Sequence, residues 1–209
     1  EVLGFAGVSD NGQQELCEAI YGGIPITSGK IELDGEDVTN ESVKDRIKLG
    51  MGYAAADRYR YGMVAEMSMS ENMLLKSSYL NKWANHGLIR WSALHRYTED
   101  SIKQYAIKAP DHTVTAGSLS GGNQQKMVVA REVDMGDKLI IFDQPTRGLD
   151  LGAFTKQFLV REIKEKRFFL SQQNSQRSLH SPTGLQFFIK ERSWEFLKTV
   201  SLQRRRLDC

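Results

Sequence analysis

The sequence has little of several features that would assign a function at once. Its 209 residues include only two cysteines, Cys17 and Cys209, which form neither a disulfide framework nor a metal-ligand set and fit a reducing compartment. No run of about 18 apolar residues occurs, so we expect no membrane-spanning helix. The first residues lack the pattern of a secretory signal, so we expect none there. Lys and Arg number 28 against 26 Asp and Glu, and this balance argues against nucleic-acid binding driven by bulk charge.

The composition also changes along the chain. No alanine follows Ala153, and from Arg167 onward eight Lys or Arg stand against three Asp or Glu, without a sustained apolar period. Two interpretations stay open: a basic, partly disordered tail, or a continuation in a shifted reading frame. The chain begins at Glu1 inside an apolar run, so we expect a fragment.

Up to Ala153, strand and helix signals alternate, which is typical of an α/β fold. We expect, in order, a strand over 1–6, a helix over 13–21, a hairpin over 29–38, helices within 70–109 and over 123–133, and a buried parallel strand over 138–142. One of these helices is expected over 91–106, with Ser92 as its cap. Trp83, Trp91 and Tyr97 are expected to pack among the helices.

The first chemical motif is a glycine-rich turn between the first strand and the first helix. Gly7 and Gly12 have the spacing of the outer glycines in the phosphate-binding pattern G-x-x-x-x-G-K-[ST]. Backbone N–H groups and a helix N-terminus wrap an anion in such a loop. Gln13 replaces the lysine and Gln14 replaces the Mg²⁺-binding hydroxyl, so this turn should hold a triphosphate weakly.

A second motif lies about a hundred residues further on. Leu119 to Lys126 reads LSGGNQQK, in which Ser120 caps a helix while Gly121 and Gly122 leave backbone N–H groups bare. An apolar strand then ends in the carboxylate of Asp143, a position suited to Mg²⁺. The joint order and spacing of the two turns and this carboxylate are far more specific than any one of them.

With these motifs the chain resembles the nucleotide-binding domain of an ATP-binding-cassette transporter. It is most similar to the second cassette of tandem ATPases that energise simple-sugar and nucleoside importers. The similarity covers residues 1 to about 160 and is carried by five segments: GVSDNGQQEL (7–16), GYAAADR (52–58), SENMLLKS (70–77), LSGGNQQK (119–126) and DQPTRGLDLGA (143–153). It implies a P-loop NTPase (RecA-like) core with an inserted helical subdomain, and it implies that strands before residue 1 and core elements after about 161 are missing.

Several residues depart from the family pattern. Ala55 and Ala56 replace the usual Pro-Glu, and Asp10 adds negative charge where a phosphate would lie. Gln144 stands where the family has the Glu that polarises water, and a glutamine cannot act as a base. His180 lies outside the context of the family's switch histidine, and no residue can be named as the adenine-stacking aromatic.

The resemblance also implies a role for each matching residue. Two cassettes would meet head to tail around ATP and Mg²⁺, and Asp150 would cross the interface between the two sites. The chain's own degenerate site would consist of Gly7, Ser9, Asn11, Gly12, Gln13 and Gln14, with Asp143 and Gln144 in the catalytic positions and Asp143 on the metal. The residues that would complete the partner's site are Ser120, Gly121, Gly122 and Gln124.

The resemblance implies partners and a location as well. These are a second cassette, membrane permease subunits facing residues 58–75, a solute-binding protein acting indirectly, and no nucleic acid. The chain would lie on the cytoplasmic face of the inner membrane as a peripheral subunit. The expected domains are a cassette over 1–160, with its core in 1–69 and 117–160 and its helical subdomain at about 70–131, and a divergent tail over 161–209. Two alternatives remain: a non-functional truncated remnant, and a non-transport ABC-type ATPase acting on DNA.

Overall fold

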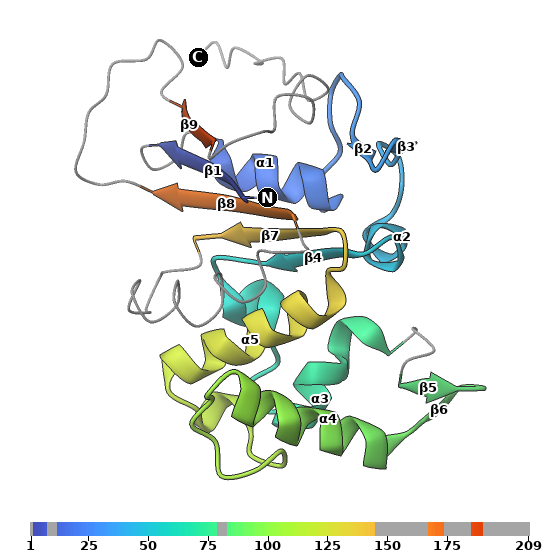
Figure 1. The fold of residues 1–209 in the computed structure, drawn as a ribbon, viewed down its shortest axis with the longest axis vertical. Helices are drawn as coiled ribbons and strands as arrows, with labels where there is room; N and C mark the ends of the chain where they lie inside the picture. The colour runs from blue at the N-terminus through green and yellow to red at the C-terminus, as the bar shows by residue number, and fades with distance from the viewer. Residues whose placement is uncertain (1, 8–11, 79–82, 145–166, 174–184, 190–209) are drawn as a thin grey trace.

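A five-stranded sheet forms the centre of the chain (Figure 1). The computed structural model describes residues 2–7, 12–78, 83–144, 167–173 and 185–189. The strands, in spatial order, are β4 (Met51–Ala54), β7 (Leu139–Asp143), β8 (Arg167–Gln173), β1 (Val2–Gly7) and β9 (Leu185–Ile189). The first four run parallel, and β9 is antiparallel to β1. Their carboxyl ends therefore meet at one edge of the sheet, the edge at which ligands bind in open α/β sheets.

Strand β7 separates two hydrophobic cores because its side chains alternate between the faces of the sheet. Leu139 and Ile141 pack on one side with helix α1, whereas Ile140 and Phe142 pack on the other with helix α5. All five residues of β7 are buried. This continuous apolar run is what a strand covered on both faces requires.

On the first face lie α1 (Gln13–Tyr21), α2 (Val43–Lys48) and the hairpin of β2 (Glu32–Leu33) and β3 (Glu36–Asp37). Gly12 precedes α1 with a φ of 88°, and Gly22 follows it with a φ of 90°, a backbone region that favours glycine. Arg46, only 2% exposed, donates to the carbonyls of Ala19 and Ile20 and so satisfies the last turn of α1.

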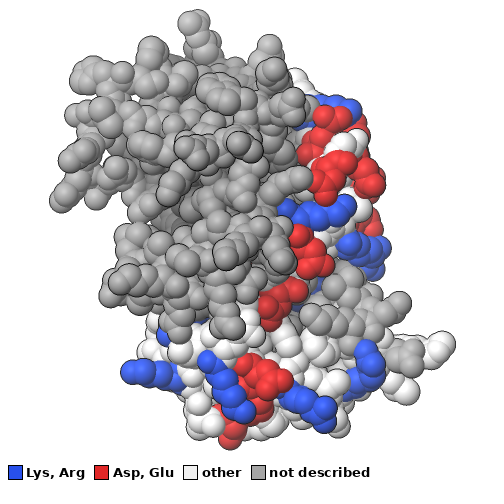
Figure 2. Space-filling model, viewed as in Figure 1, with Lys and Arg blue, Asp and Glu red and all other residues white. Residues whose placement is uncertain are grey.

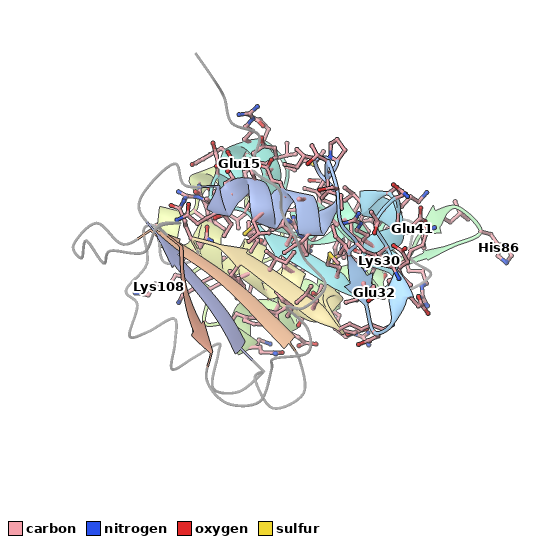
Figure 3. The ribbon with its side chains drawn as sticks, turned by 90° about the horizontal axis from the view of Figure 1, so that it is seen from above. Glu15, Lys30, Glu32, Glu41, His86 and Lys108 are labelled. Atoms are coloured by element: carbon pink, nitrogen blue, oxygen red, sulfur yellow. The ribbon has the colours of Figure 1, made fainter. Side chains whose placement is uncertain are left out.

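On the second face lie α3 (Met69–Leu74), α4 (Trp91–Gln104) and α5 (Gly121–Met135) (Figure 1). Short elements connect them: the π-helix η1 (Arg58–Gly62), the 3₁₀ turns η2 (Leu75–Ser77) and η3 (Ala116–Ser118), and the hairpin of β5 (Ala84–Asn85) and β6 (Leu88–Ile89). A capping box between Ser68 and Glu71 starts α3. Figure 3 shows His86 pointing outward from the tip of the β5–β6 hairpin.

Charged residues of both signs occur together on the described surface (Figure 2), and some of them form ion pairs. In Figure 2 acidic and basic side chains are interspersed on the visible face. Lys48 pairs with Asp45, and Lys30 pairs with Glu32 and Asp37. Within the described ranges, no helix is long and apolar enough to cross a membrane.

The structure confirms most of the elements predicted before residue 145. The first helix, the 29–38 hairpin and the buried strand at 138–142 are present. The prediction of Ser92 as a cap is wrong, because α4 begins one residue earlier and Arg90 occupies the N-cap position. Trp91 is also not packed as expected: it is 43% exposed, although its ring lies 5.8 Å from that of His95. Trp83 is buried as predicted and its ring lies 4.6 Å from that of Tyr97.

The sheet contains three strands that the sequence did not predict, β4 and two that come after residue 160. We expected residues 161–209 to form a divergent tail, yet Arg167–Gln173 forms β8 between β1 and β7, and Leu185–Ile189 forms β9. Parallel pairing uses backbone groups, so a segment of unusual composition can still complete a sheet. The expected boundary near residue 160 lies outside the described residues.

Candidate functional site

The carboxyl edge of the sheet brings together the start of α1 and the end of β7. α1 follows β1 and begins after Gly12, and an added Cβ at Gly12 would meet nothing within 4 Å. The first turn of a helix has backbone N–H groups without partners inside the helix, the groups that hold an anion in phosphate-binding loops. Gln13 is 5% exposed, and Gln14 donates through Nε2 to Glu18 Oε1 at 2.8 Å. Neither side chain brings a positive charge to this turn.

Asp143 ends β7 on the α1 side of the sheet. It follows Ile141 by two residues and therefore shares its face. Its side chain is 1% exposed. The pKa of the neighbouring Tyr53 phenol is raised above its usual range. Burial is the larger cause and the negative charge of Asp143 is the second. Gln144 comes next with a φ of 49°, so the chain turns sharply after the carboxylate.

This carboxyl edge suits a magnesium ion that is held mainly by a nucleotide. Mg²⁺ in phosphate-transfer sites takes one or two carboxylates and completes its shell with phosphates and water. Asp143 supplies one carboxylate beside the open helix start. Among the described residues no group of three or more His, Cys, Asp or Glu could hold a metal without such help.

The second glycine-rich turn lies exposed at the start of the 15-residue helix α5. Ser120 is the N-cap as predicted, but its side chain caps no backbone N–H of its own helix. Instead Ser120 Oγ accepts from Asn123 Nδ2 at 2.8 Å, and Asn123 Oδ1 accepts from the backbone N–H of Lys108 at 2.9 Å. Ser120 and Gly121 are both exposed, and Gly122 is partly buried. Because the Ser120 oxygen accepts, its hydroxyl proton is not used in this bond.

Gln124 does not lie with the exposed part of this turn. It is 2% exposed, and its Oε1 accepts from Arg58 Nε at 2.9 Å and from Tyr59 Oη at 3.1 Å. Its Nε2 donates to the carbonyl of Ala116 at 3.2 Å. We expected Gln124 to help complete the site of a partner cassette, and that role stays a prediction; in this structure its amide bonds within the chain. The sequence gives no sign of this, because the partners are 65 and 66 residues away.

The segment after β4 forms a short π-helix with an exposed aromatic surface. Asp57 Oδ1 accepts from the backbone N–H groups of Tyr59 and Arg60, both at 3.1 Å, and so starts the turn. The exposed large apolar side chains here are Tyr59, Tyr61, Val64 and Met67. π-helical turns are rare and occur often at functional positions. The sequence motif at residues 52–58 marked this segment, but not its π-helical conformation.

Several predicted site residues lie outside the described residues. These are Ser9 and Asn11 in the first turn, Asp10 beside them, and Asp150 after β7. Gly7 is described as the last residue of β1. The roles predicted for all of them stay predictions.

Sequence comparison identifies the kind of protein that shares these features. A family model described as ABC transporter matches residues 1–147. The nucleoside import ATP-binding protein NupA of Lactococcus lactis is 38% identical over 73% of this chain and 30% of its own length. The guanosine import ATP-binding protein NupO of Bacillus subtilis is 37% identical over 80% of this chain and 32% of its own length. The chain thus spans about a third of the length of these curated relatives.

Structural comparison gives the same fold. A dimeric ATP-binding cassette in a post-hydrolysis state with ADP and phosphate superposes with a TM-score of 0.65 at 18% identity, over 81% of this chain and 73% of that one. A nucleotide-free cassette of an ABC transporter gives 0.61 at 20% identity, over 80% and 68%. At these identities the likeness establishes the fold, an α/β cassette with helices on both faces of its sheet.

Proposed function

The chain belongs to the ABC transporter family over residues 1–147, and on that premise we propose that it forms part of the ATP-binding subunit of an importer for simple sugars or nucleosides. The names of its relatives support this solute class, since they import nucleosides, guanosine and ribose. The proposed organisation is a cassette over 1–160, with its core in 1–69 and 117–160 and a helical subdomain at about 70–131.

The proposed activity of the chain is to complete an ATP site whose other parts lie on a second cassette. The exposed turn Ser120–Gly122 carries this proposal, because it presents a hydroxyl and bare N–H groups at the positive end of a 15-residue helix. Such donors stabilise charge that develops on a transferred phosphoryl group. Asp150 would cross the interface beside them.

The chain's own site is proposed to bind ATP and Mg²⁺ with little turnover. Gln13 and Gln14 bring no cation to the phosphate loop, and Gln144 is not a base. Asp143 would hold Mg²⁺ together with the nucleotide phosphates, and the metal would neutralise phosphate charge there. The site would act as a structural or regulatory one.

Membrane permease subunits are the proposed partners of the exposed surface formed by Tyr59, Tyr61, Val64 and Met67. Exposed apolar groups clustered on a segment of nine residues favour contact with another protein. The chain would then sit peripherally on the cytoplasmic face of the membrane, with a solute-binding protein acting through the permease.

ATP hydrolysis by mixed cassettes tests the proposal. The purified chain is assayed alone and with an intact N-terminal cassette of an import ATPase, using Ser120→Ala and the matched variant Ser118→Ala. Ser118 lies two residues away and donates to the Thr115 carbonyl inside the preceding turn. We expect hydrolysis only in the mixture, a loss of about tenfold or more with Ser120→Ala, and little change with Ser118→Ala.

Other outcomes would favour other conclusions. Turnover by the chain alone would overturn the degenerate-site assignment. Absence of both ATP binding and hydrolysis in every mixture would favour the truncated remnant. Hydrolysis stimulated by DNA and not by a second cassette would favour a non-transport ATPase.

A further inference from the structure

One face of α5 holds the segment Asp57–Gly62 along its length. The contacts come from Gln124, Val128 and Arg131, which are spaced four and three residues apart and therefore share one side of the helix. Gln124 binds Arg58 and Tyr59 at the start of η1. At the other end, an added Cβ on Gly62 would lie 3.5 Å from the methyl groups of Val128.

Arg131 fixes the far end of the segment. Its side chain is 1% exposed and donates through Nη2 to the Gly62 carbonyl at 2.6 Å and through Nη1 to the Asn72 carbonyl at 2.9 Å. Asn72 in turn bonds the backbone N–H and the carbonyl of Val64. Buried charge-assisted hydrogen bonds of this kind are stronger than neutral ones and hold one geometry.

Gln124 also joins η1 to the exposed glycine turn. Its carboxamide accepts two bonds from η1 and donates to the carbonyl of Ala116 in η3, just before Ser120. The Arg58 guanidinium lies so near the turn that a Cβ on Gly121 would stand 2.9 Å from Nη2. A single buried side chain therefore connects two segments that are both exposed elsewhere.

Tyr59 shows how the two surfaces are connected. Its side chain is 57% exposed, yet its hydroxyl bonds Gln124. A partner that presses on the exposed ring therefore acts on a group anchored in the helix that carries Ser120. Both ends of η1 are fixed to α5, which is the contact that a transfer of displacement from the ring to the helix would need.

We propose that Gln124 is a positioning residue: it couples the exposed surface at Tyr59 and Tyr61 to the glycine turn Ser120–Gly122, so that the two shift together. The coupling is a property of this chain alone. Its use, in which a partner bound at Tyr59 and Tyr61 changes the geometry of an ATP site, rests on the proposed function. Gln124 acts through its bonds to Arg58, Tyr59 and Ala116.

Hydrogen exchange of the full chain, followed by mass spectrometry, tests the coupling without any ligand. Asp57→Ala removes the group that starts η1 and should loosen that turn. We expect amides of residues 116–122 to exchange about fivefold faster as well, the factor that one lost hydrogen bond gives. In a Gln124→Leu background these amides already exchange faster, and adding Asp57→Ala should change them no further.

A matched control is Ser42→Ala, which removes the equivalent side-chain contact at the start of α2, where Ser42 accepts from the Asp45 N–H. It should leave residues 116–122 unchanged. The coupling does not exist if Asp57→Ala leaves the exchange rates of residues 116–122 unchanged. It is also absent if Asp57→Ala raises these rates equally in the unaltered and Gln124→Leu backgrounds. Tyr59→Phe, an exposed change that removes one bond to Gln124, gives the same test if Gln124→Leu does not fold.

A functional measurement then separates positioning from bulk stability. In the mixed-cassette assay Gln124→Glu keeps the acceptor for Arg58 and Tyr59 but loses the donor to the Ala116 carbonyl, so it should lose hydrolysis as Gln124→Leu does at equal folded fraction. Hydrolysis close to that of the unaltered chain in either variant would overturn the positioning role. If no mixture hydrolyses ATP, the proposed function fails, whereas the exchange result still decides the coupling.

Discussion

At the residue scale, Gly52 shows how closely α5 approaches the sheet. An added Cβ at this position would stand 2.6 Å from the backbone carbonyl oxygen of Glu132. A Cβ is fixed to its backbone and the Glu132 oxygen belongs to the backbone, so neither atom can rotate away. Strand β4 and helix α5 would therefore have to separate. We expect Gly52→Ala to lower the free energy of unfolding by about 1–3 kcal/mol, measured by urea denaturation.

The matched control for this substitution is Gly23→Ala, where the nearest atom would lie at an ordinary 3.5 Å. It should cost little, since alanine restricts the unfolded chain more than glycine does. Equal destabilisation by the two variants would refute the close-approach argument.

Buried tyrosines make stability depend on alkaline pH. Tyr97 and Tyr105 donate to Asp134 at 2.7 Å each, and burial, followed by the charge of Asp134, raises the pKa of Tyr97 above its usual range. The folded chain thus keeps this proton while the unfolded chain loses it near pH 10. The contribution of this proton to the free energy of unfolding is fully present below that pH. It should be lost as the pH rises above about 10.

The measurement compares urea unfolding at pH 8 and pH 10.5. Tyr97→Phe should weaken the fall in stability between the two, because it removes one group that titrates. Tyr61→Phe is the matched control, since Tyr61 is 44% exposed and should leave the fall unchanged. An identical pH dependence in all three proteins would contradict the assignment.

At the element scale, β4 is the edge strand of the sheet as far as the chain is described, and side chains satisfy its backbone on the outer side. Glu132 Oε2 accepts from the Tyr53 N–H at 3.1 Å, and Lys76 Nζ donates to the Tyr53 carbonyl at 3.0 Å. Lys76 and Arg131 both pair with Glu132. Burial would raise the pKa of Glu132, but these two cations hold it below its usual value. The cluster links the helical layer to the sheet edge.

Removing the central carboxylate should be costly. Glu132→Ala leaves the Tyr53 N–H without its acceptor and leaves Lys76 and Arg131 without their counter-charge in the interior, and we expect a loss of about 3–5 kcal/mol in urea denaturation. Lys48→Ala removes an exposed ion pair with Asp45 and should give no measurable change. A cost for Glu132→Ala no larger than that of the control would show that the cluster is not structural.

At the scale of the whole molecule, β8 joins the two parts of the sheet. It pairs with β1 on one side and β7 on the other, so without it β1 and β9 have no strand link to β4 and β7. A chain ending at residue 160 should therefore unfold less cooperatively and bind a hydrophobic dye more strongly than the full chain.

The comparison for this truncation is a chain ending at residue 189, which retains every described strand. It should match the full chain in its urea transition. If the chain ending at 160 is equally cooperative, β8 is not part of the folding unit, and the tail predicted from composition is the better description of residues 161–209.

Local pattern was sufficient for the elements around the two glycine-rich turns. Gly12 before an amphipathic run predicted α1, and Ser120 before a glycine pair predicted the start of α5. These signals depend on neighbours within one or two turns. Ser92 failed as a cap because Arg90 already occupies the position where the helix begins after the β5–β6 hairpin.

The sequence by itself determined the family, the α/β order of elements and the candidate residues, because spacing in a short motif fixes which backbone groups surround a phosphate. Only the tertiary structure decided that Gln124 faces inward to Arg58 and Tyr59, that Glu132 and Lys76 bond the edge of β4, and that β8 completes the sheet. Each of these is a contact between residues far apart in sequence. Such contacts depend on burial and on how backbone groups are paired in three dimensions, which no local pattern records.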